Sequence, residues 1–334
     1  MALPPSLFIR TAKTIWTTLW RTMMAQMAPS DKQGAYQRPE STFCDRIPTS
    51  GFPAESQRYR LIVGMGCPWA HRTLIVRVLK GLEAAIPITV VSPSGDEGCW
   101  VFDRPSPTES LGCRTMPQFY KKVHPGYAGR ATVPVLWDAQ TQTIVNNESA
   151  EIIEILNDGF NDWAVQPELD LYPATLQSHI DQWNQRIYTA VNNGVYRCGF
   201  AQTQAAYETA CDQLFNTLDD IDQTLANQRY LCGSQLTLAD VRLFTTLIRF
   251  DVAYYSLFKC NRRRMAEYQH LSGYIRDLYQ LPGISKTCDV NAIKRDYFGN
   301  LFPLNPGGII PLGPDLENLN TPHGRENIGS AAGA

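Results

Sequence analysis

The pattern of hydrophobic and polar positions divides the chain into two regions with different periods. Between residues 59 and 158, short apolar runs alternate with stretches of helical spacing, a pattern typical of a layered α/β domain. The first strand leads through a glycine turn into a helix that Pro68 opens, which places Cys67 at the helix N-terminus. The predicted elements are strand 60–63, helix 68–80, strand 87–91, a loop-rich insertion at 92–130, strands 132–137 and 143–145, and helix 148–156.

Apolar residues between 174 and 300 follow helical spacing throughout, after a linker at 159–173. Thr237 and Asp240 form a capping-box pattern at the start of one of these helices. Residues 301–334 are rich in Pro, Gly and Asn and predict a mobile tail, of which the segment 305–311 can dock. We therefore expect a thioredoxin-like α/β domain followed by an all-helical domain. The predicted helices cover 174–198, 204–227, 238–257, 263–280 and 289–299.

The segment 1–58 precedes these domains and consists of a basic amphipathic arm and an extended loop from residue 30 onward. The arm carries Arg10, Lys13 and Arg21 but no acidic residue before Asp31, and its apolar residues recur at helical spacing. Such a segment can be an organelle transit peptide, a helix on a membrane surface, or an arm packed on the folded body or a partner subunit. Because prolines are present and serines are few, we favour the packed arm over membrane contact or targeting.

Composition narrows the classes of function. Of the 334 residues, 44% are hydrophobic and 19% are charged, which is typical of a globular protein. A formal net charge of −2 argues against nucleic acid as a partner, because binding phosphates requires clustered Lys and Arg. Nine scattered cysteines without a recognisable secretion signal predict free thiols in a reducing compartment, the cytoplasm. The cysteines and histidines lack the spacing of metal ligands, so we expect no metal site.

Cys67 is the residue in this sequence with the clearest chemical assignment. A helix N-terminus presents unpaired N–H groups and a partial positive charge, both of which favour a thiolate. We therefore expect the pKa of Cys67 to fall into the range of roughly 3.5–7.5 known for such sites. Ala70 occupies the place where dithiol proteins carry a second cysteine, so Cys67 needs an external thiol to resolve a mixed disulfide. In a reducing compartment, that thiol is glutathione.

Two further motifs are suited to a glutathione site beside Cys67. A proline after Val133 at the start of a strand, expected to be cis, would leave the Val133 backbone free to pair with an extended peptide. Glu148 and Ser149 open the following helix, whose N–H groups and Ser149 hydroxyl can hold the γ-glutamyl carboxylate. The alternative for this pair is a plain helix cap.

The complete set of motifs resembles that of glutathionyl-hydroquinone reductases, the Xi class of the glutathione transferase superfamily, over about residues 30 to 311. By this resemblance we expect a homodimer with glutathione as co-substrate. The matching motifs are Cys67-Pro68-Trp69-Ala70 with His71-Arg72, Trp100-Val101-Phe102, Thr132-Val133-Pro134, Asn146-Asn147-Glu148-Ser149, Asn192-Asn193-Gly194-Val195-Tyr196, Arg249-Phe250-Asp251 and Phe258-Lys259-Cys260-Asn261.

The resemblance also implies roles for individual residues. Cys67 corresponds to the nucleophile that attacks a glutathionyl-hydroquinone, and Tyr196 to the proton donor for the departing ring. Tyr254 and Tyr297 correspond to hydroxyls that stabilise the thiolate, although Tyr255 competes with Tyr254 for this place. The implied glutathione contacts are Trp100, Arg130, Ala131, Thr132, Val133, Glu148 and Ser149.

Two alternative functions share parts of this pattern. An omega-like glutathione transferase with thioltransferase or dehydroascorbate reductase activity also has a single cysteine beside a glutathione site. The long insertion with Trp100 and the motif that contains Tyr196 argue against it. A non-catalytic carrier of aromatic ligands is a second alternative, which the presence of Cys67, Glu148 and Ser149 argues against.

Overall fold

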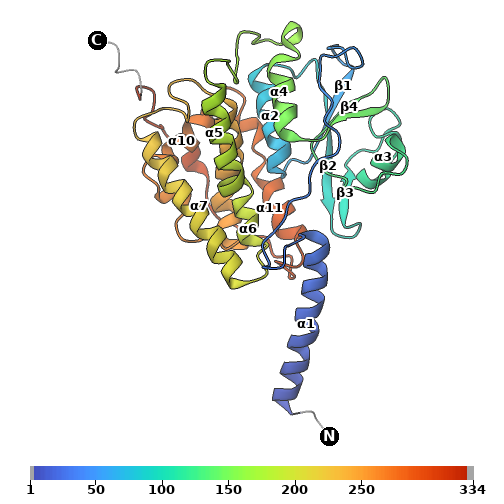
Figure 1. The fold of residues 1–334 in the computed structure, drawn as a ribbon, viewed down its shortest axis with the longest axis vertical. Coiled ribbons are helices and arrows are strands. Elements are labelled where there is room, and N and C mark those ends of the chain that lie inside the picture. Colours follow the sequence, from blue (N-terminus) through green and yellow to red (C-terminus); the bar gives the residue numbers. More distant parts are fainter. Residues whose placement is uncertain (1–3, 329–334) are drawn as a thin grey trace.

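The computed structural model describes residues 4–328. Its first domain is built on a five-stranded mixed sheet (Figure 1). The strand order is β3-β2-β1-β4-β5, with β1 and β2 parallel and every other neighbouring pair antiparallel. The elements are β1 (Tyr59–Val63), α2 (Pro68–Leu79), β2 (Ile88–Ser94), β3 (Cys99–Phe102), α3 (Met116–Val123), β4 (Val135–Asp138), β5 (Thr143–Asn146) and α4 (Ser149–Asp158).

Both faces of this sheet are buried because side chains alternate along its central strands. In β1, Leu61 and Val63 join the core shared with the helices, whereas Ile62 belongs to a second core on the other face. Phe119 of α3 completes that second core by packing edge-on against Trp137, with ring centroids 5.4 Å apart. The insertion at 92–130, predicted to be rich in loops, also supplies β3 and α3, which the sequence pattern did not predict.

The second domain is helical, as predicted, but two of the expected long helices are interrupted. The segment predicted as 174–198 contains a π-helical turn at Tyr188–Asn192, and the segment predicted as 238–257 contains another at Phe250–Tyr254. Such turns are frequent at functional sites. The helices are α5 (Gln177–Ile187), α6 (Gly194–Gly199), α7 (Gln204–Leu225), α8 (Leu238–Arg249), α9 (Tyr255–Leu257), α10 (Leu271–Gln280) and α11 (Val290–Asn300).

Helix α2 joins the two domains, because it packs on α4 in the first domain and on α8 in the second. Its residues from Pro68 to Arg77 are all buried. At the start of α8, Asp240 accepts a hydrogen bond of 2.9 Å from the backbone N–H of Thr237, as the capping-box pattern predicts. The N-terminus of α2 is thus enclosed between the sheet and the helical domain.

The N-terminal arm forms one helix, α1 (Pro5–Met27), which extends away from both domains (Figure 1). Only its C-terminal end contacts the body: Met24 is buried, and the Trp20 indole donates a hydrogen bond of 3.1 Å to the Pro303 carbonyl. Packing of the arm on the body is therefore confirmed for this end alone. Residues 1–3 of the predicted arm lie outside the described residues.

The Pro/Gly-rich tail lies against the helical domain as far as residue 328. Gln280 donates hydrogen bonds of 2.7 Å to the carbonyls of Leu319 and Thr321. Arg325 is buried and donates to the Leu225 carbonyl at 3.1 Å. The tail therefore contacts the helical domain around Leu319, Thr321 and Arg325, whereas residues 306–310, part of the segment expected to dock, are exposed. Residues 329–334 lie outside the described part. Among residues 4–328, none of the helices has the length and apolar character needed to cross a bilayer.

Candidate active site

Cys67 is the N-cap residue of α2, as its position before Pro68 predicts. Its sulfur lies 3.8 Å from the carbonyl oxygen of Val133, and the Val133–Pro134 peptide bond is cis. Strand β4 begins only at Val135, so the Val133 backbone lies outside the sheet ladder and beside the thiol. Position 64, in the turn before Cys67, requires glycine, because a Cβ there would collide with the Trp100 ring.

Burial of the sulfur raises the pKa of the Cys67 thiol above its usual value. Hydrogen bonds from the backbone N–H groups of Ala70 and Trp69 act in the opposite direction, as the helix N-terminus predicts. The positive charges of Arg249 and Arg38 also lower it. The prediction of a lowered pKa is therefore wrong for this structure, because the cost of enclosing the charge exceeds the stabilisation by the helix and the two cations.

Gly66, the residue before Cys67, is held by the helical domain through both its N–H and its carbonyl group. The Gly66 carbonyl accepts a hydrogen bond of 3.0 Å from Nε of Arg249, and the Gly66 N–H donates to the Asp296 carboxylate. A Cβ at position 66 would overlap the Asp296 carboxylate, so only glycine allows this approach. Arg249 and Asp296 come from α8 and α11, far from Cys67 in the sequence, and together they fix the position of the nucleophile.

His71, the fourth residue of α2, supports Arg249 rather than reacting itself. Because a guanidinium can only donate, the contact of 2.8 Å between Arg249 and Nδ1 of His71 assigns the imidazole proton to Nε2. Nε2 then donates to the Thr287 hydroxyl at 2.8 Å. Burial, together with the charge of Arg249, lowers the pKa of His71 well below its usual value, so the ring is neutral.

Asp296 gives a testable pH dependence. Burial raises its pKa from 3.8 to about 7, so the folded protein binds this proton more tightly than the unfolded chain. The contribution of Asp296 to the free energy of unfolding is fully present below the pKa that this carboxyl has in the unfolded chain. It is lost as the pH rises through the pKa that the carboxyl has in the folded protein. Relative to Asp296→Asn, the wild type should lose up to about 4 kcal/mol of unfolding free energy over that interval.

Urea unfolding from acid to neutral pH measures this difference. Asp289→Asn, at the N-cap of the same helix, is the comparison and should retain most of the wild-type slope, because the charge of Asp289 makes only a minor contribution to the raised pKa of Asp296. If the Asp296→Asn profile runs parallel to that of the wild type, another group is responsible for the pH dependence.

Three tyrosine hydroxyls meet near the thiol. The hydroxyl of Tyr297 lies 2.6 Å from that of Tyr196 and 2.8 Å from that of Tyr254. Burial raises the pKa of all three phenols, and the charge of Cys67 acts in the same direction on Tyr196 and Tyr254. They are therefore protonated at neutral pH and able to donate. Tyr255 lies instead beneath the Arg264 guanidinium, 5.0 Å from the ring centroid, so Tyr254 belongs to the cluster.

Trp69 connects the tyrosine cluster to the first domain. Its ring stacks on Tyr196 with centroids 6.3 Å apart and an interplanar angle of 26°. The Arg38 guanidinium lies 3.9 Å from the Trp69 centroid, and that of Arg72 lies 4.5 Å from it. Arg38 comes from the extended loop at 30–58, which thus contributes a cation to the site. This arrangement provides aromatic surfaces and positive charge next to Cys67.

The residues predicted to bind glutathione lie on segments around the first domain. Glu148 caps α4 by accepting a hydrogen bond of 3.0 Å from the Ala150 N–H, so the alternative of a helix cap is confirmed for it, and its contact with glutathione stays a prediction. Ser149 is buried, and its hydroxyl accepts a hydrogen bond of 3.4 Å from Arg72. Tyrosine hydroxyls hold the carbonyls of Arg130 and Thr132, each at 3.0 Å, and thereby fix the loop that contains Ala131 and leads to Val133.

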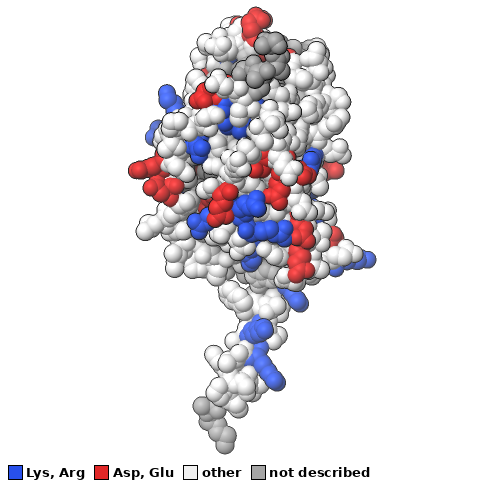
Figure 2. Space-filling view, turned by 90° about the vertical axis from the view of Figure 1, so that its left-hand side faces the viewer, with Lys and Arg blue, Asp and Glu red and all other residues white. Residues whose placement is uncertain are grey.

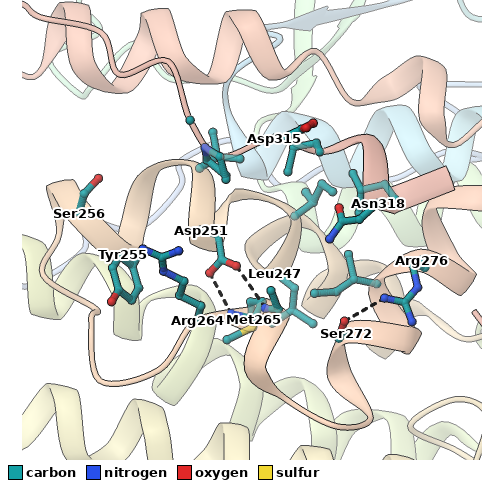
Figure 3. Close-up of a pocket in the computed structure, with 18 of the residues that line it drawn as sticks. Leu247, Asp251, Tyr255, Ser256, Arg264, Met265, Ser272, Arg276, Asp315 and Asn318 are labelled. Atoms are coloured by element: carbon teal, nitrogen blue, oxygen red, sulfur yellow. Dashed lines mark hydrogen bonds between the residues drawn. The ribbon is translucent and has the colours of Figure 1, made fainter. Parts of the chain in front are cut away.

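A cavity of about 630 Å³ lies elsewhere, between the helical domain and the docked tail (Figure 3). Tyr255, Arg264 and Arg276 line it together with apolar residues of α8 and α10. Asp251 is one of the lining residues and accepts a hydrogen bond of 2.8 Å from the Met265 N–H (Figure 3). None of the residues predicted for glutathione or for the reaction lines this cavity.

Three charged residues near Cys67 were not among the predicted site residues: Arg38, Arg249 and Asp296. Arg249 had a signal in the sequence, because it ends an apolar helical run in which a charge is costly unless it has a function. It is completely buried, and its Nη2 has no hydrogen-bond partner within residues 4–328. Arg38 and Asp296 lie in sequence contexts that are typical of exposed residues, so no signal marked them.

Comparison with known proteins agrees with this architecture. The family model described as "Glutathione S-transferase, N-terminal domain" matches residues 66–158, and "Glutathione S-transferase, C-terminal domain" matches residues 204–277. The chain is 46% identical to the Escherichia coli protein named glutathionyl-hydroquinone reductase YqjG over 306 residues, which cover 88% of this chain and 93% of that protein.

Solved structures show the same relationship. The glutathione-S-transferase Xi from Phanerochaete chrysosporium superimposes with a TM-score of 0.83 at 45% identity, covering 88% of this chain and 96% of that one. The glutathione-bound structure of YqjG from Escherichia coli gives a TM-score of 0.78 at 46% identity, with 87% and 93% covered. Both the predicted fold and the predicted kinship are thus confirmed. The chain belongs to the glutathione S-transferase family.

Proposed function

We propose that this protein is an enzyme that uses glutathione to reduce glutathionyl-hydroquinones to free hydroquinones. The observation that carries the proposal is the placement of a single thiol at a helix N-terminus beside three hydrogen-bonded tyrosines. The name of the Escherichia coli relative, glutathionyl-hydroquinone reductase, supports the same substrate class. A helix-capping cysteine alone would fit many thiol enzymes, whereas adjacent phenolic donors suit a reaction that releases a carbon centre needing a proton.

Glutathione is held, in this proposal, along the Val133 backbone and at the start of α4. An extended tripeptide that pairs with Val133 brings its sulfur to Cys67, because the Val133 carbonyl is 3.8 Å from Sγ. Glu148 and Ser149 then take the γ-glutamyl end, and Arg130, Ala131 and Thr132 flank the peptide. Trp100 covers the glycine turn before Cys67 and provides a flat wall.

In the first step, the Cys67 thiolate attacks the sulfur of the thioether between glutathione and the hydroquinone ring. A disulfide bond forms between Cys67 and glutathione, the carbon–sulfur bond breaks, and its electron pair stays on the ring carbon. Tyr196 donates the proton that this carbon requires. Tyr254 and Tyr297 stabilise the charged thiolate by hydrogen bonding, and the positive charge of Arg249 favours it further.

In the second step, another glutathione thiolate attacks the mixed disulfide. Its attack forms oxidised glutathione and releases the Cys67 thiolate, so each carbon–sulfur bond that is reduced to carbon–hydrogen consumes one free glutathione, whose sulfur pairs with the sulfur of the former thioether. Ala70 stands where a second cysteine could otherwise have performed this step internally. The homodimer and the cytoplasmic location remain predictions.

The substrate class is tested with purified protein, glutathionyl-menadiol and excess glutathione. We expect release of free menadiol and oxidised glutathione in equal amounts, both measured by chromatography. Dehydroascorbate serves as the control substrate for an omega-like activity. Reduction of dehydroascorbate without release of menadiol would contradict the proposal and favour the omega-like activity. If Cys67 reacts with neither substrate, the non-catalytic carrier of aromatic ligands is favoured.

A further inference from the structure

Helix α1 exposes a row of large apolar side chains. Phe8, Ile9, Ile15, Trp16 and Leu19 each leave 48% to 64% of their surface accessible. Figure 1 shows the helix extending away from both domains, so no other part of the described chain covers these residues. Side chains of this size are rarely exposed as a contiguous group unless the group contacts a partner.

The apolar residues share one face of the helix. At about 100° per residue, Phe8, Ile9, Ile15, Trp16 and Leu19 fall within an arc of about 120°, and of the large exposed apolar residues only Leu7 lies outside it in the described helix. Five threonines and Ser6 lie on the remaining arc. The hydroxyls of Thr14, Thr18 and Thr22 each donate to the carbonyl four residues earlier, at 2.9 to 3.0 Å, so the polar face needs no protein partner.

Positive charge accompanies the polar face. Arg10, Lys13 and Arg21 all lie on it, and no acidic residue occurs before Asp31. Figure 2 shows blue side chains among white ones along the projecting helix. A partner that contacts both faces must therefore combine an apolar interior with an anionic surface. Pairing of two copies of α1 through their apolar faces would instead leave the cations of both helices on the outside, with no acidic residue before Asp31 to balance them.

We propose that α1 lies in the surface of an anionic lipid bilayer and holds the protein there. The aromatic residues Phe8 and Trp16 suit the boundary between headgroups and acyl chains, and the cations suit the headgroup phosphates. The helix is attached firmly to the body, because Met24 is buried and Trp20 is bonded to the Pro303 carbonyl. Binding of α1 therefore brings the whole molecule to the membrane.

Sedimentation of the full chain with phospholipid vesicles tests this inference. The vesicles contain phosphatidylcholine and phosphatidylserine in equal parts, with phosphatidylcholine alone as the comparison. Leu19→Gln should weaken binding to the anionic vesicles by about tenfold, because it removes one buried apolar side chain. Thr18→Gln, next to it but on the polar face, should stay within about twofold of the wild type. Replacing Arg10, Lys13 and Arg21 with Gln should weaken binding by roughly a hundredfold.

The melting temperature of each variant should match that of the wild type, since these side chains do not contribute to the core. Absence of binding to anionic vesicles would overturn the inference, as would equal losses for Thr18→Gln and Leu19→Gln. A wild-type dimer that Leu19→Gln dissociates, without vesicle binding, would identify a second copy as the occupant. Processing of the arm by an organelle import machinery, again without vesicle binding, would identify a targeting receptor instead.

Discussion

Replacement of Cys67 by alanine is expected to abolish the release of hydroquinone from glutathionyl-menadiol. The proposed reaction has no other thiol at the N-terminus of α2, and Ala70 excludes a second one in the same motif. Without Cys67 no covalent intermediate forms, so cleavage of the carbon–sulfur bond is no longer divided into two easier steps. We expect the rate to fall by at least about 10⁴-fold, to the uncatalysed background.

The matched control is Cys44→Ala, which removes an exposed thiol from the extended loop. This variant should retain the wild-type rate and melting temperature. Cys67→Ser adds a second comparison, because it keeps the size and polarity of the side chain while removing the sulfur nucleophile. Turnover by either Cys67 variant at a rate near that of the wild type would refute the mechanism.

Replacement of Tyr196 by phenylalanine is expected to lower kcat by roughly 10²-fold, with little change in KM. The Tyr196 hydroxyl is part of the chain that continues through Tyr297 to Tyr254. Because burial holds its pKa well above 10, this phenol carries its proton throughout the neutral range and can give it to the ring carbon. The aromatic surface that stacks on Trp69 is retained in the variant, so substrate binding should persist.

Steady-state kinetics measure this change, and Tyr255→Phe is the control because that hydroxyl lies outside the cluster, beside Arg264. The wild-type kcat is expected for Tyr255→Phe. If Tyr196→Phe retains the wild-type kcat while Tyr297→Phe loses it, the donor is Tyr297 and the role assigned to Tyr196 is wrong.

The fold could be predicted where the signal was local. The periodicity of apolar residues located β1, α2, α7 and α11 to within a few residues. It missed β3 and α3, because they are short elements within an insertion whose Pro, Gly and Ser residues are typical of loops. β3 pairs antiparallel with β2 across the turn at residues 95–98. The two π-helical turns were also missed, since their sequences follow helical spacing.

The candidate site was predictable as far as single motifs extend. Cys67, the cis Pro134 and the N-cap of α4 all follow from local sequence rules. The pKa of Cys67 could not be predicted in this way, because the helix N-terminus lowers it whereas burial against a domain distant in sequence raises it. Arg249 and Asp296 contact Gly66 from about 180 and 230 positions away, and no local pattern encodes such a meeting.

The most direct test of the central claim, that Cys67 accepts the glutathionyl group, is intact-protein mass spectrometry after a single turnover. Wild-type protein is mixed with equimolar glutathionyl-menadiol in the absence of glutathione. The proposed mechanism predicts one added glutathionyl group, mapped to Cys67 by peptide digestion, together with one equivalent of free menadiol. Release of menadiol without an adduct, or an adduct on a different cysteine, would contradict it.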